Sequence, residues 1–198
     1  MKRRSTIAMG LLFAGVTAFA VAPQVSAQTA AAWGVLLDGT NMNNFTPVGN
    51  ANWRILEGAV YADRGNGFLV SKESYADFQI TAEVWTDTPA NSGIFIRCQN
   101  PNNIGANTCY EVNIFDTRPG QEYATGGIVN TATVIGPPKK AAGQWNTMVI
   151  TAKGPQLTIM FNGVKSAEAT DTKLPRGRFA LQYGAGVVKF RKVELKQI

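Results

Sequence analysis

Short runs of alternating apolar and polar residues, separated by turn-forming residues, recur along most of the chain and limit what it can fold into. No segment keeps a helical period for three turns. Asn162-Gly163 joins two such runs and is a strong signal for a two-residue hairpin turn, and Glu57-Gly58 is expected to turn another hairpin. Nine or ten short strands with frequent turns predict an all-β fold, an antiparallel β-sandwich or barrel in one domain. The runs cover 53–62, 68–71, 77–86, 92–98, 110–116, 145–154, 156–169, 178–183 and 187–195.

A long stretch at 117–144 interrupts this pattern. It is rich in Gly, Pro and small residues and shows no clear periodicity. Connections this long without secondary structure are uncommon in compact domains and usually have a function. We therefore expect the stretch to lie over one face of the sandwich as a rim or lid, with plain surface decoration as the alternative.

The first 27 residues have the pattern of an export signal and are not expected to belong to the fold. A basic start, an apolar run and a small-x-small motif follow one another at 2–4, 7–22 and 25–27. This order is typical of a cleaved secretory signal peptide, and the alternative is a single anchoring helix. We expect residues 28–198 to form one exported domain, periplasmic or secreted, with no membrane segment after cleavage.

The charge balance of the expected exported domain is mild. Removing residues 1–27 takes away three of the 19 Lys and Arg and none of the 13 Asp and Glu, so the net charge falls from +6 to +3. The remaining chain has no basic stripe and no interleaving of basic and aromatic residues. Nucleic acid is therefore not an expected partner.

The chain contains no histidine. This excludes a Ser-His-Asp triad, a Cys-His pair and a His-ligated zinc. Any acid–base chemistry must therefore use carboxylates, Lys, Tyr or a bound water. No loop has the dense oxygen-ligand pattern of a calcium site, and we expect neither a metal nor a cofactor.

Both cysteines, Cys98 and Cys109, fall in the expected exported part, and the residues between them are polar and turn-rich. In an oxidising compartment such a pair is expected to form a disulfide that closes a loop. Two reduced thiols are the alternative.

Successive side chains of a strand point to opposite faces, so each predicted strand has one apolar face and one that mixes polar and aromatic residues. If these strands share a sheet, the mixed faces bring together Glu83, Trp85, Phe95, Arg97, Glu111, Asn113 and Gln182. Such a mixture suits a sugar, since carboxylates and amides bond to hydroxyls while aromatic rings pack on the apolar faces of pyranose rings. A solvated face with ordinary cross-strand ion pairs is an equal alternative.

Asp116 ends the run YEVNIFD with the wrong parity to join Glu111 unless a bulge intervenes. The spacing E-x-N-x-x-D loosely resembles the acidic strand of jelly-roll β-glucanases, E-x-D-x-x-E, in which a bulge brings the last carboxylate onto the catalytic face. Asp116 could equally begin the turn that follows.

Several stretches in a fixed order resemble one known family. They are WGVLLDGTN (33–41), NWRILEGAV (52–60), FLVSKESYADF (68–78), NSGIFIR (91–97), YEVNIFD (110–116), WNT (145–147), FNG (161–163) and LQYG (181–184). On these stretches, from about Trp33 to Leu195, the chain resembles the 3-keto-disaccharide hydrolase domain family. The resemblance implies a concanavalin-like jelly roll, which agrees with the strand pattern.

The resemblance also implies cleavage of glycosides already oxidised at C3, a small carbohydrate substrate. A C3 ketone acidifies the C2–H, so a carboxylate can remove that proton and the enediolate can expel the C1 substituent before water adds. Such a site needs a base, a donor for the enolate oxygen and an acid for the leaving group. On the matching positions we expect Glu111 as base, Arg97 at the oxyanion, and Glu83 or Asp116 as acid. The residues expected to bind substrate are Asn91, Asn113, Gln182, Tyr183 and Trp85.

Two positions depart from the family pattern. Asn113 stands where many members have Gln, and Tyr183 stands where many have His. Two other functions stay open on the same fold, because fold alone does not fix function. One is a non-catalytic, lectin-like sugar-binding module. The other is an ordinary retaining glycosidase using Glu111 and Asp116, whose carboxylates should then lie about 5–5.5 Å apart.

Overall fold

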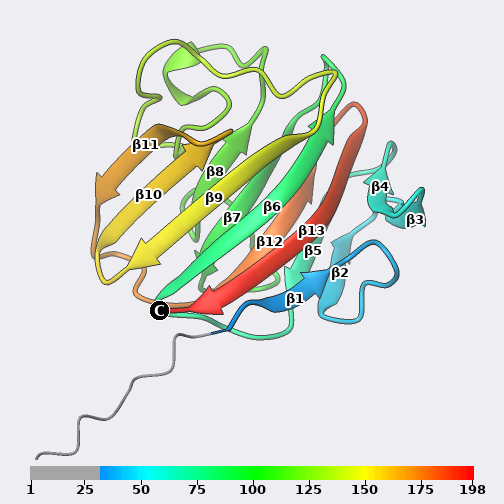
Figure 1. Cartoon of the computed structure of the whole chain (residues 1–198), viewed down its shortest axis with the longest axis horizontal. Coiled ribbons are helices and arrows are strands. Elements are labelled where there is room, and N and C mark those ends of the chain that lie inside the picture. Colours follow the sequence, from blue (N-terminus) through cyan, green and yellow to red (C-terminus); the bar gives the residue numbers. More distant parts are fainter. Residues whose placement is uncertain (1–31) are drawn as a thin grey trace, which may run out of the picture. The chain divides into compact units, whose positions relative to one another are not determined.

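The structure, a computed structural model, describes residues 32–198, and the predicted signal peptide lies outside them. These residues form thirteen strands and one short 3-10 helix, arranged as two antiparallel sheets packed face to face (Figure 1). The predicted all-β sandwich is therefore confirmed. No helix within 32–198 has the length and apolar character needed to span a bilayer.

The large sheet lies in front in Figure 1. Its strands are β1 (Gly34–Leu37), β3 (Arg54–Leu56), β4 (Ala59–Ala62), β6 (Phe78–Thr86), β9 (Asn146–Lys153), β10 (Gln156–Phe161), β11 (Val164–Thr170) and β13 (Val188–Gln197). Their order across the sheet is β11-β10-β9-β6-β13-β4-β3, and β1 also pairs with β13.

The small sheet lies behind the large one. Its strands are β2 (Phe45–Gly49), β5 (Gly67–Ser71), β7 (Ser92–Cys98), β8 (Tyr110–Ile114) and β12 (Arg178–Tyr183). Their order is β2-β5-β12-β7-β8, so β8 is the last strand on one side. Each predicted run corresponds to observed strands, whereas β1 and β2 were not predicted.

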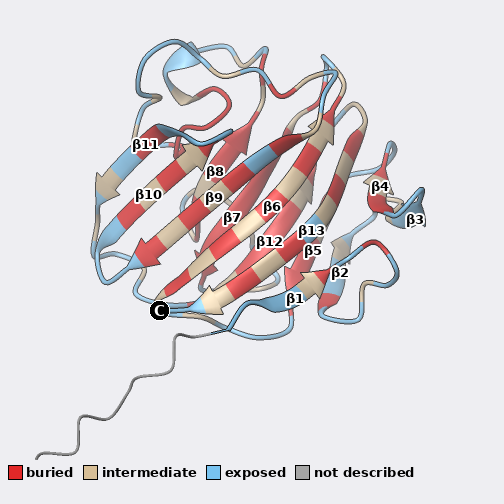
Figure 2. Ribbon diagram, in the orientation of Figure 1, coloured by how far each residue is buried: buried red, intermediate tan, exposed pale blue. Residues whose placement is uncertain are grey.

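The core lies between the two sheets and follows from strand alternation. Along β6, every second residue is buried, and Figure 2 shows the same banding along most strands. The inward residues of both sheets form one apolar cluster that includes Ile80, Val84, Ile94, Leu181 and Phe190. Side chains of opposite parity therefore lie on the outer faces.

Both predicted hairpin turns are present. Asn162 and Gly163 join β10 to β11 with φ values of 49° and 77°, and Glu57 and Gly58 join β3 to β4 with φ values of 52° and 71°. Two consecutive residues with positive φ are the mark of the type I′ turn, whose twist matches that of the strands it joins.

The stretch at 117–144 contains only the 3-10 helix η1 (Gln121–Tyr123) and closes one side of the sandwich. Asn113 of β8 exchanges backbone hydrogen bonds with Gly126 and Gly127, both of 2.9 Å, and the Ile135 N–H donates to Ser166 O of β11 at 2.7 Å. In Figure 1 this yellow-green segment begins after β8, loops above β10 and β11, and then crosses the upper ends of the strands to β9. Near its end, Ala142 bridges Thr86, the last residue of β6. Of the rim or lid that the sequence predicts, the segment is a rim. It follows the β8–β11 side and the end of β6, and it does not lie over a face of the sandwich.

Candidate functional site

The structure separates the predicted site residues between two sheets. Glu83 and Trp85 lie on β6 of the large sheet and alternate with buried core residues, so both point out of that sheet. There Glu83 forms ion pairs with Arg191 and Lys192, and Lys189 Nζ lies 4.8 Å from the centre of the Trp85 ring. The prediction that they share a surface with Glu111 is wrong, because alternation assigns a face but not a sheet.

Arg97 also fails to join Glu111, because β7 contains a bulge. Phe95 pairs with Ala180 and Cys98 with Arg178, so β7 has one more residue than β12 between these pairs, and Arg97 has a φ of 54°. A bulge changes the direction of the side chain at that position. The Arg97 side chain is 1% exposed and turns toward the loops that carry Ala76, Gly154 and Leu174.

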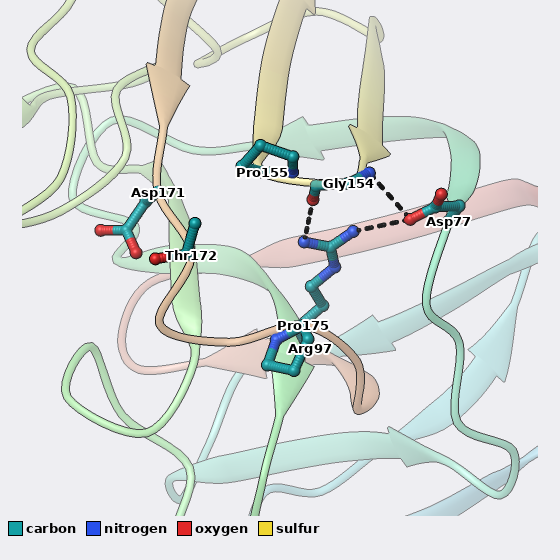
Figure 3. A pocket seen from close by; sticks show the side chains of 7 residues that line it. All are labelled: Asp77, Arg97, Gly154, Pro155, Asp171, Thr172 and Pro175. Carbon is teal, nitrogen blue, oxygen red and sulfur yellow. Dashed lines mark hydrogen bonds and ion pairs between the residues drawn. The ribbon is translucent and has the colours of Figure 1, made fainter.

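There every N–H group of the Arg97 guanidinium is engaged, and Figure 3 shows its bonds to Gly154 and Asp77. The guanidinium donates five hydrogen bonds, which is all that its five N–H groups can make. The acceptors are Ala76 O (3.0 and 2.7 Å), Gly154 O (2.8 Å), Leu174 O (3.2 Å) and Asp77 Oδ1 (3.2 Å). Arg97 therefore holds three loops together and has no donor left for an oxyanion, so its predicted role is wrong.

A cavity of about 260 Å³ lies beside Arg97. Its lining contains no other predicted site residue and consists of Asp77, Arg97, Gly154, Pro155, Asp171, Thr172 and Pro175 (Figure 3).

Asp116 is a structural carboxylate. It is 6% exposed and accepts hydrogen bonds from Thr125 Oγ1 at 2.6 Å and from the N–H groups of Ala141 and Ala142 at 2.9–3.0 Å. Its backbone oxygen also accepts from Lys140 Nζ at 3.0 Å. Asp116 thus ties the two ends of the 117–144 segment together, and neither of its predicted roles, leaving-group acid or glycosidase carboxylate, fits this position.

Tyr183 is a core residue. Its ring is 3% exposed, packs edge-on against Trp53 at 6.4 Å, and belongs to the cluster between the sheets. The hydroxyl donates to Gly186 O at 3.0 Å. Because Tyr183 points inward, the prediction that it contacts substrate is wrong.

Four of the predicted residues remain together on the outer face of the small sheet. Glu111 and Asn113 lie on β8, Gln182 lies on β12, and Asn91 precedes β7, the strand between them. Asn113 pairs with Gly93 of β7. Gln182 lies on the other side of Gly93, because a Cβ built on this glycine would be 3.4 Å from Gln182 Oε1. The two amides are thus separated only by a residue without a side chain.

Asn91 is held at the end of this group. Its backbone exchanges hydrogen bonds with Ala185 and accepts one from the Gly184 N–H at 2.9 Å. A Cβ on Gly184 would approach Asn91 Nδ2 to 3.3 Å, so the amide lies against a second glycine.

Two amide oxygens of this group are buried without a hydrogen-bond donor from residues 32–198, namely Asn113 Oδ1 and Gln182 Oε1. Asn113 Nδ2 donates to Tyr123 O at 2.6 Å, which fixes the orientation of that amide and leaves its oxygen free. Buried polar atoms normally have partners, so free acceptors of this kind indicate a place where a ligand or water donates.

Glu111 is the carboxylate of this face. It pairs directly with Phe95, which is 1% exposed, and the Glu111 side chain is itself partly buried. Burial raises the pKa of Glu111 above its ordinary value, and the positive charge of Arg118 partly opposes that rise in pKa. A carboxyl group with a raised pKa is suited to accept a proton.

An apolar cluster lies beside Glu111 on the same outer face. It consists of Val70, Phe95, Cys98, Cys109 and Ala180, with Val48, Phe68 and Ile104 packed against them. The predicted disulfide between Cys98 and Cys109 is confirmed and holds the 99–108 loop over this cluster. Phe68 stands edge-on to Phe95 at 5.3 Å, pairs with Gln182 across β5 and β12, and keeps part of its ring exposed.

Sequence reasoning missed Phe68 and Arg118. The parity of Phe68 in the run 68–71 was the only signal that could have placed its ring on this face. Arg118 lies in the irregular segment, where alternation assigns no direction. Within 32–198, no group of three or more Asp, Glu and Cys residues is placed to hold a metal ion.

Several solved structures share the sandwich fold of this chain. A proposed glycosyl hydrolase from Parabacteroides distasonis has 22% identity and a TM-score of 0.71, with 84% of this chain and 100% of that chain covered. A second from the same organism has 16% identity and a TM-score of 0.75, with coverage of 84% and 94%. The carbohydrate binding module CBM66 from Bacillus subtilis has 16% identity and a TM-score of 0.62, with coverage of 78% and 96%. At these identities the likeness establishes the sandwich fold.

A search of curated proteins finds no match. A family model described as a 3-keto-alpha-glucoside-1,2-lyase-like domain matches residues 32–196, which is nearly the whole described chain. The match supports a carbohydrate-related function and agrees with the resemblance seen in the sequence. The chain belongs to the family of 3-keto-alpha-glucoside-1,2-lyase-like domains.

Proposed function

We propose that the protein cleaves glycosides oxidised at C3 by elimination followed by hydration, with Glu111 as general base. The observation that carries the proposal is the grouping of a partly buried carboxyl group with two donor-free amide oxygens on one outer face. Membership of a family described as 3-keto-alpha-glucoside-1,2-lyase-like supports this choice of substrate class.

The chemistry requires one proton acceptor at the start. The C3 ketone acidifies the C2–H, and the Glu111 carboxylate takes this proton while the electron pair of the C–H bond forms the enolate. The enolate then expels the alcohol at C1, which leaves with a proton, and an enone remains. Addition of water to the enone gives the free 3-keto sugar, so the sum of the steps is hydrolysis.

The proton for the leaving alcohol is already in the site under this proposal. The two carboxylates expected from the sequence as the acid do not serve this step. Glu83 lies on the other sheet, and Asp116 accepts hydrogen bonds from backbone N–H groups and a hydroxyl. Glu111 is a neutral acid once it has taken the C2 proton. It can return that proton to the departing oxygen, directly or through water, so one carboxyl group acts as base and then as acid.

The neighbouring side chains supply binding. Gln182 Oε1 and Asn113 Oδ1 accept hydrogen bonds from substrate hydroxyls, which would satisfy both buried oxygens. Asn91 extends the row of amides, and the exposed part of Phe68 gives an apolar surface for a pyranose ring.

The test is turnover of 3-keto-disaccharides by the purified protein and by its Glu111→Gln variant. We expect the wild type to release the free sugar and the variant to be slower by roughly 10²–10⁴-fold, the usual contribution of a general base. Glu83→Gln, which removes a carboxylate from the other sheet, is the matched control and should keep full activity. Binding without turnover, unchanged in Glu111→Gln, would instead identify a lectin-like module.

We also infer that residues 28–198 act as one exported domain in the periplasm or outside the cell. The disulfide between Cys98 and Cys109 supports an oxidising compartment. Cell fractionation of the full chain, with the N-terminus of the mature protein determined, tests both the location and the cleavage after residue 27.

A further inference from the structure

Arg118 is held in a fixed turn at the start of the rim segment. Its N–H donates to Phe115 O at 3.4 Å, and its own backbone oxygen accepts from Gln121 Nε2 at 2.5 Å. Two residues earlier, the Asp116 carboxylate is anchored by Thr125, Ala141 and Ala142. The backbone that carries Arg118 is therefore positioned before any substrate arrives.

The Arg118 side chain has a buried donor without an acceptor. Its Nε is buried and has no hydrogen-bond partner among residues 32–198, and the guanidinium forms no ion pair with a carboxylate of that part of the chain. Arg97 is the opposite case, with every N–H engaged. Leaving a buried charged donor unpaired costs free energy, so the position indicates a partner that comes from outside residues 32–198.

The turn that carries Arg118 adjoins the amide group of the outer face. Asn113 Nδ2 donates to Tyr123 O at 2.6 Å, and Gln121, in the same 3-10 turn as Tyr123, donates to Arg118 O. The positive charge of Arg118 lowers the pKa of the Glu111 carboxyl group and opposes the effect of burial. The two groups do not form an ion pair, so their charges interact across a distance longer than that of an ion pair. The outer face of the small sheet thus combines a base, two free acceptors and one free cationic donor.

We propose that Arg118 is a further catalytic residue, whose Nε–H donates to the C3 oxygen of the bound 3-keto sugar and stabilises the negative charge of the enolate. This inference rests on the proposed function. As Glu111 removes the C2 proton, the C–H electron pair moves into the C2–C3 bond and the charge falls on the C3 oxygen. A preorganised charged donor at that oxygen stabilises the transition state more than the ground state, because the charge exists only there.

The inference separates two events that can be measured independently. Exchange of the C2 hydrogen with solvent deuterium reports enolate formation, and release of the C1 alcohol reports elimination. With wild-type protein and a 3-keto-disaccharide, both should occur. If the wild type neither exchanges C2–H nor releases alcohol, the proposed function fails, whatever the Arg118 variants do.

If the wild type is active, the Arg118 variants test the inference. Arg118→Gln should slow C2–H exchange and alcohol release together by about 10²–10³-fold, the usual cost of one oxyanion donor. Arg118→Lys, which keeps a positive charge, should have rates between those of the wild type and those of Arg118→Gln. Arg176→Gln, at an exposed arginine that is outside the group of Asn91, Glu111, Asn113 and Gln182, should match the wild type.

Two further readouts distinguish catalysis from a structural role. Without Arg118 the acid limb of the kcat/KM profile should move to higher pH, because a positive charge that lowers the pKa of Glu111 is gone. Added guanidinium should restore part of the activity of Arg118→Ala. If Arg118→Gln does not fold, Arg118→Lys and the guanidinium rescue decide the matter. Wild-type exchange rates in Arg118→Gln or Arg118→Lys, or no rescue of a folded Arg118→Ala, would overturn the inference.

Discussion

Glu111 lies directly opposite Phe95 across β7 and β8, so its side chain leaves the sheet beside a buried aromatic side chain, and it forms no ion pair with a residue of 32–198. An apolar neighbour disfavours the ionised form of a carboxyl group, whereas a close cation favours it. The pairing therefore explains why the pKa of Glu111 is raised although Arg118 acts on it in the opposite direction.

This pairing predicts the pH dependence of activity. A general base must be ionised, so kcat/KM should fall as the pH drops through the raised pKa of Glu111, which lies above the ordinary value of 4.5. A pH–rate profile with a 3-keto-disaccharide checks this, and an acid limb at or below 4.5 would contradict it.

The same pKa shift predicts a stability difference. The folded state binds the Glu111 proton more tightly than the unfolded state, so stability decreases as the pH rises from 4.5 through the folded-state pKa. Glu111→Gln lacks this decrease and should melt at a higher temperature than the wild type at pH 7, with a smaller difference near pH 4. Equal pH dependence of the two melting temperatures would show that Glu111 has an ordinary environment.

Gly93 should matter for binding, because it separates the amides of Asn113 and Gln182. In Gly93→Ala the new Cβ would meet Val112 O at 3.1 Å, the Phe95 ring at 3.2 Å and Gln182 Oε1 at 3.4 Å. We expect the Gln182 amide to be displaced and KM to rise by about tenfold, as one hydrogen bond of ~1.4 kcal/mol is lost. Gly105→Ala, where a Cβ meets nothing within 4 Å, is the control.

Arg97 should be needed for stability and not for chemistry. Arg97→Met removes a buried cation and leaves carbonyl oxygens of Ala76, Gly154 and Leu174 without their donor. We expect the free energy of unfolding in urea to fall by about 3–5 kcal/mol, while the protein that stays folded keeps its turnover rate. Arg176→Met should change stability by less than about 0.5 kcal/mol. Lost activity at unchanged stability would show that Arg97 takes part in catalysis.

The variant Asp116→Asn tests whether Asp116 is a structural anchor or a catalytic acid. Asp116→Asn replaces a carboxylate oxygen with an NH₂ group that faces the N–H donors of Ala141 and Ala142. We expect the 117–144 segment to be cut faster by proteases and the melting temperature to fall. An inactive variant with wild-type proteolysis and melting would instead identify Asp116 as a chemical participant.

The disulfide should stabilise the protein without taking part in catalysis. Replacing both Cys98 and Cys109 by Ser removes a cross-link over a sequence separation of 11 residues. The chain-entropy model predicts a loss of about 3 kcal/mol. Thermal melting under oxidising conditions checks this, and an unchanged melting temperature would mean that the cross-link adds nothing to the fold.

Strand positions could be predicted from the sequence because alternation is local. The same pattern does not say which sheet a strand joins, so Glu83 and Trp85 were grouped with Glu111 although β6 belongs to the large sheet. β1 and β2 were missed since one has only four residues and the other carries Pro47, which is tolerated at the edge position that β2 occupies.

The site could be predicted only in part for a related reason. Glu111, Asn113 and Gln182 lie on regular strands, where parity holds, and the structure brings them together. Arg97 lies at a bulge that breaks the parity by one residue. Arg118 lies in an irregular segment whose course depends on the four hydrogen bonds accepted by Asp116, and no periodic pattern describes such a course.

Residues 126–135 form hydrogen bonds with backbone groups of Asn113 and Ser166. A strand from another molecule would otherwise pair with these same groups. Exposed strand margins of this kind are templates for intermolecular pairing and aggregation. The longest irregular part of the chain thus also protects against self-association, and a version shortened there would be expected to polymerise even if each copy still folded.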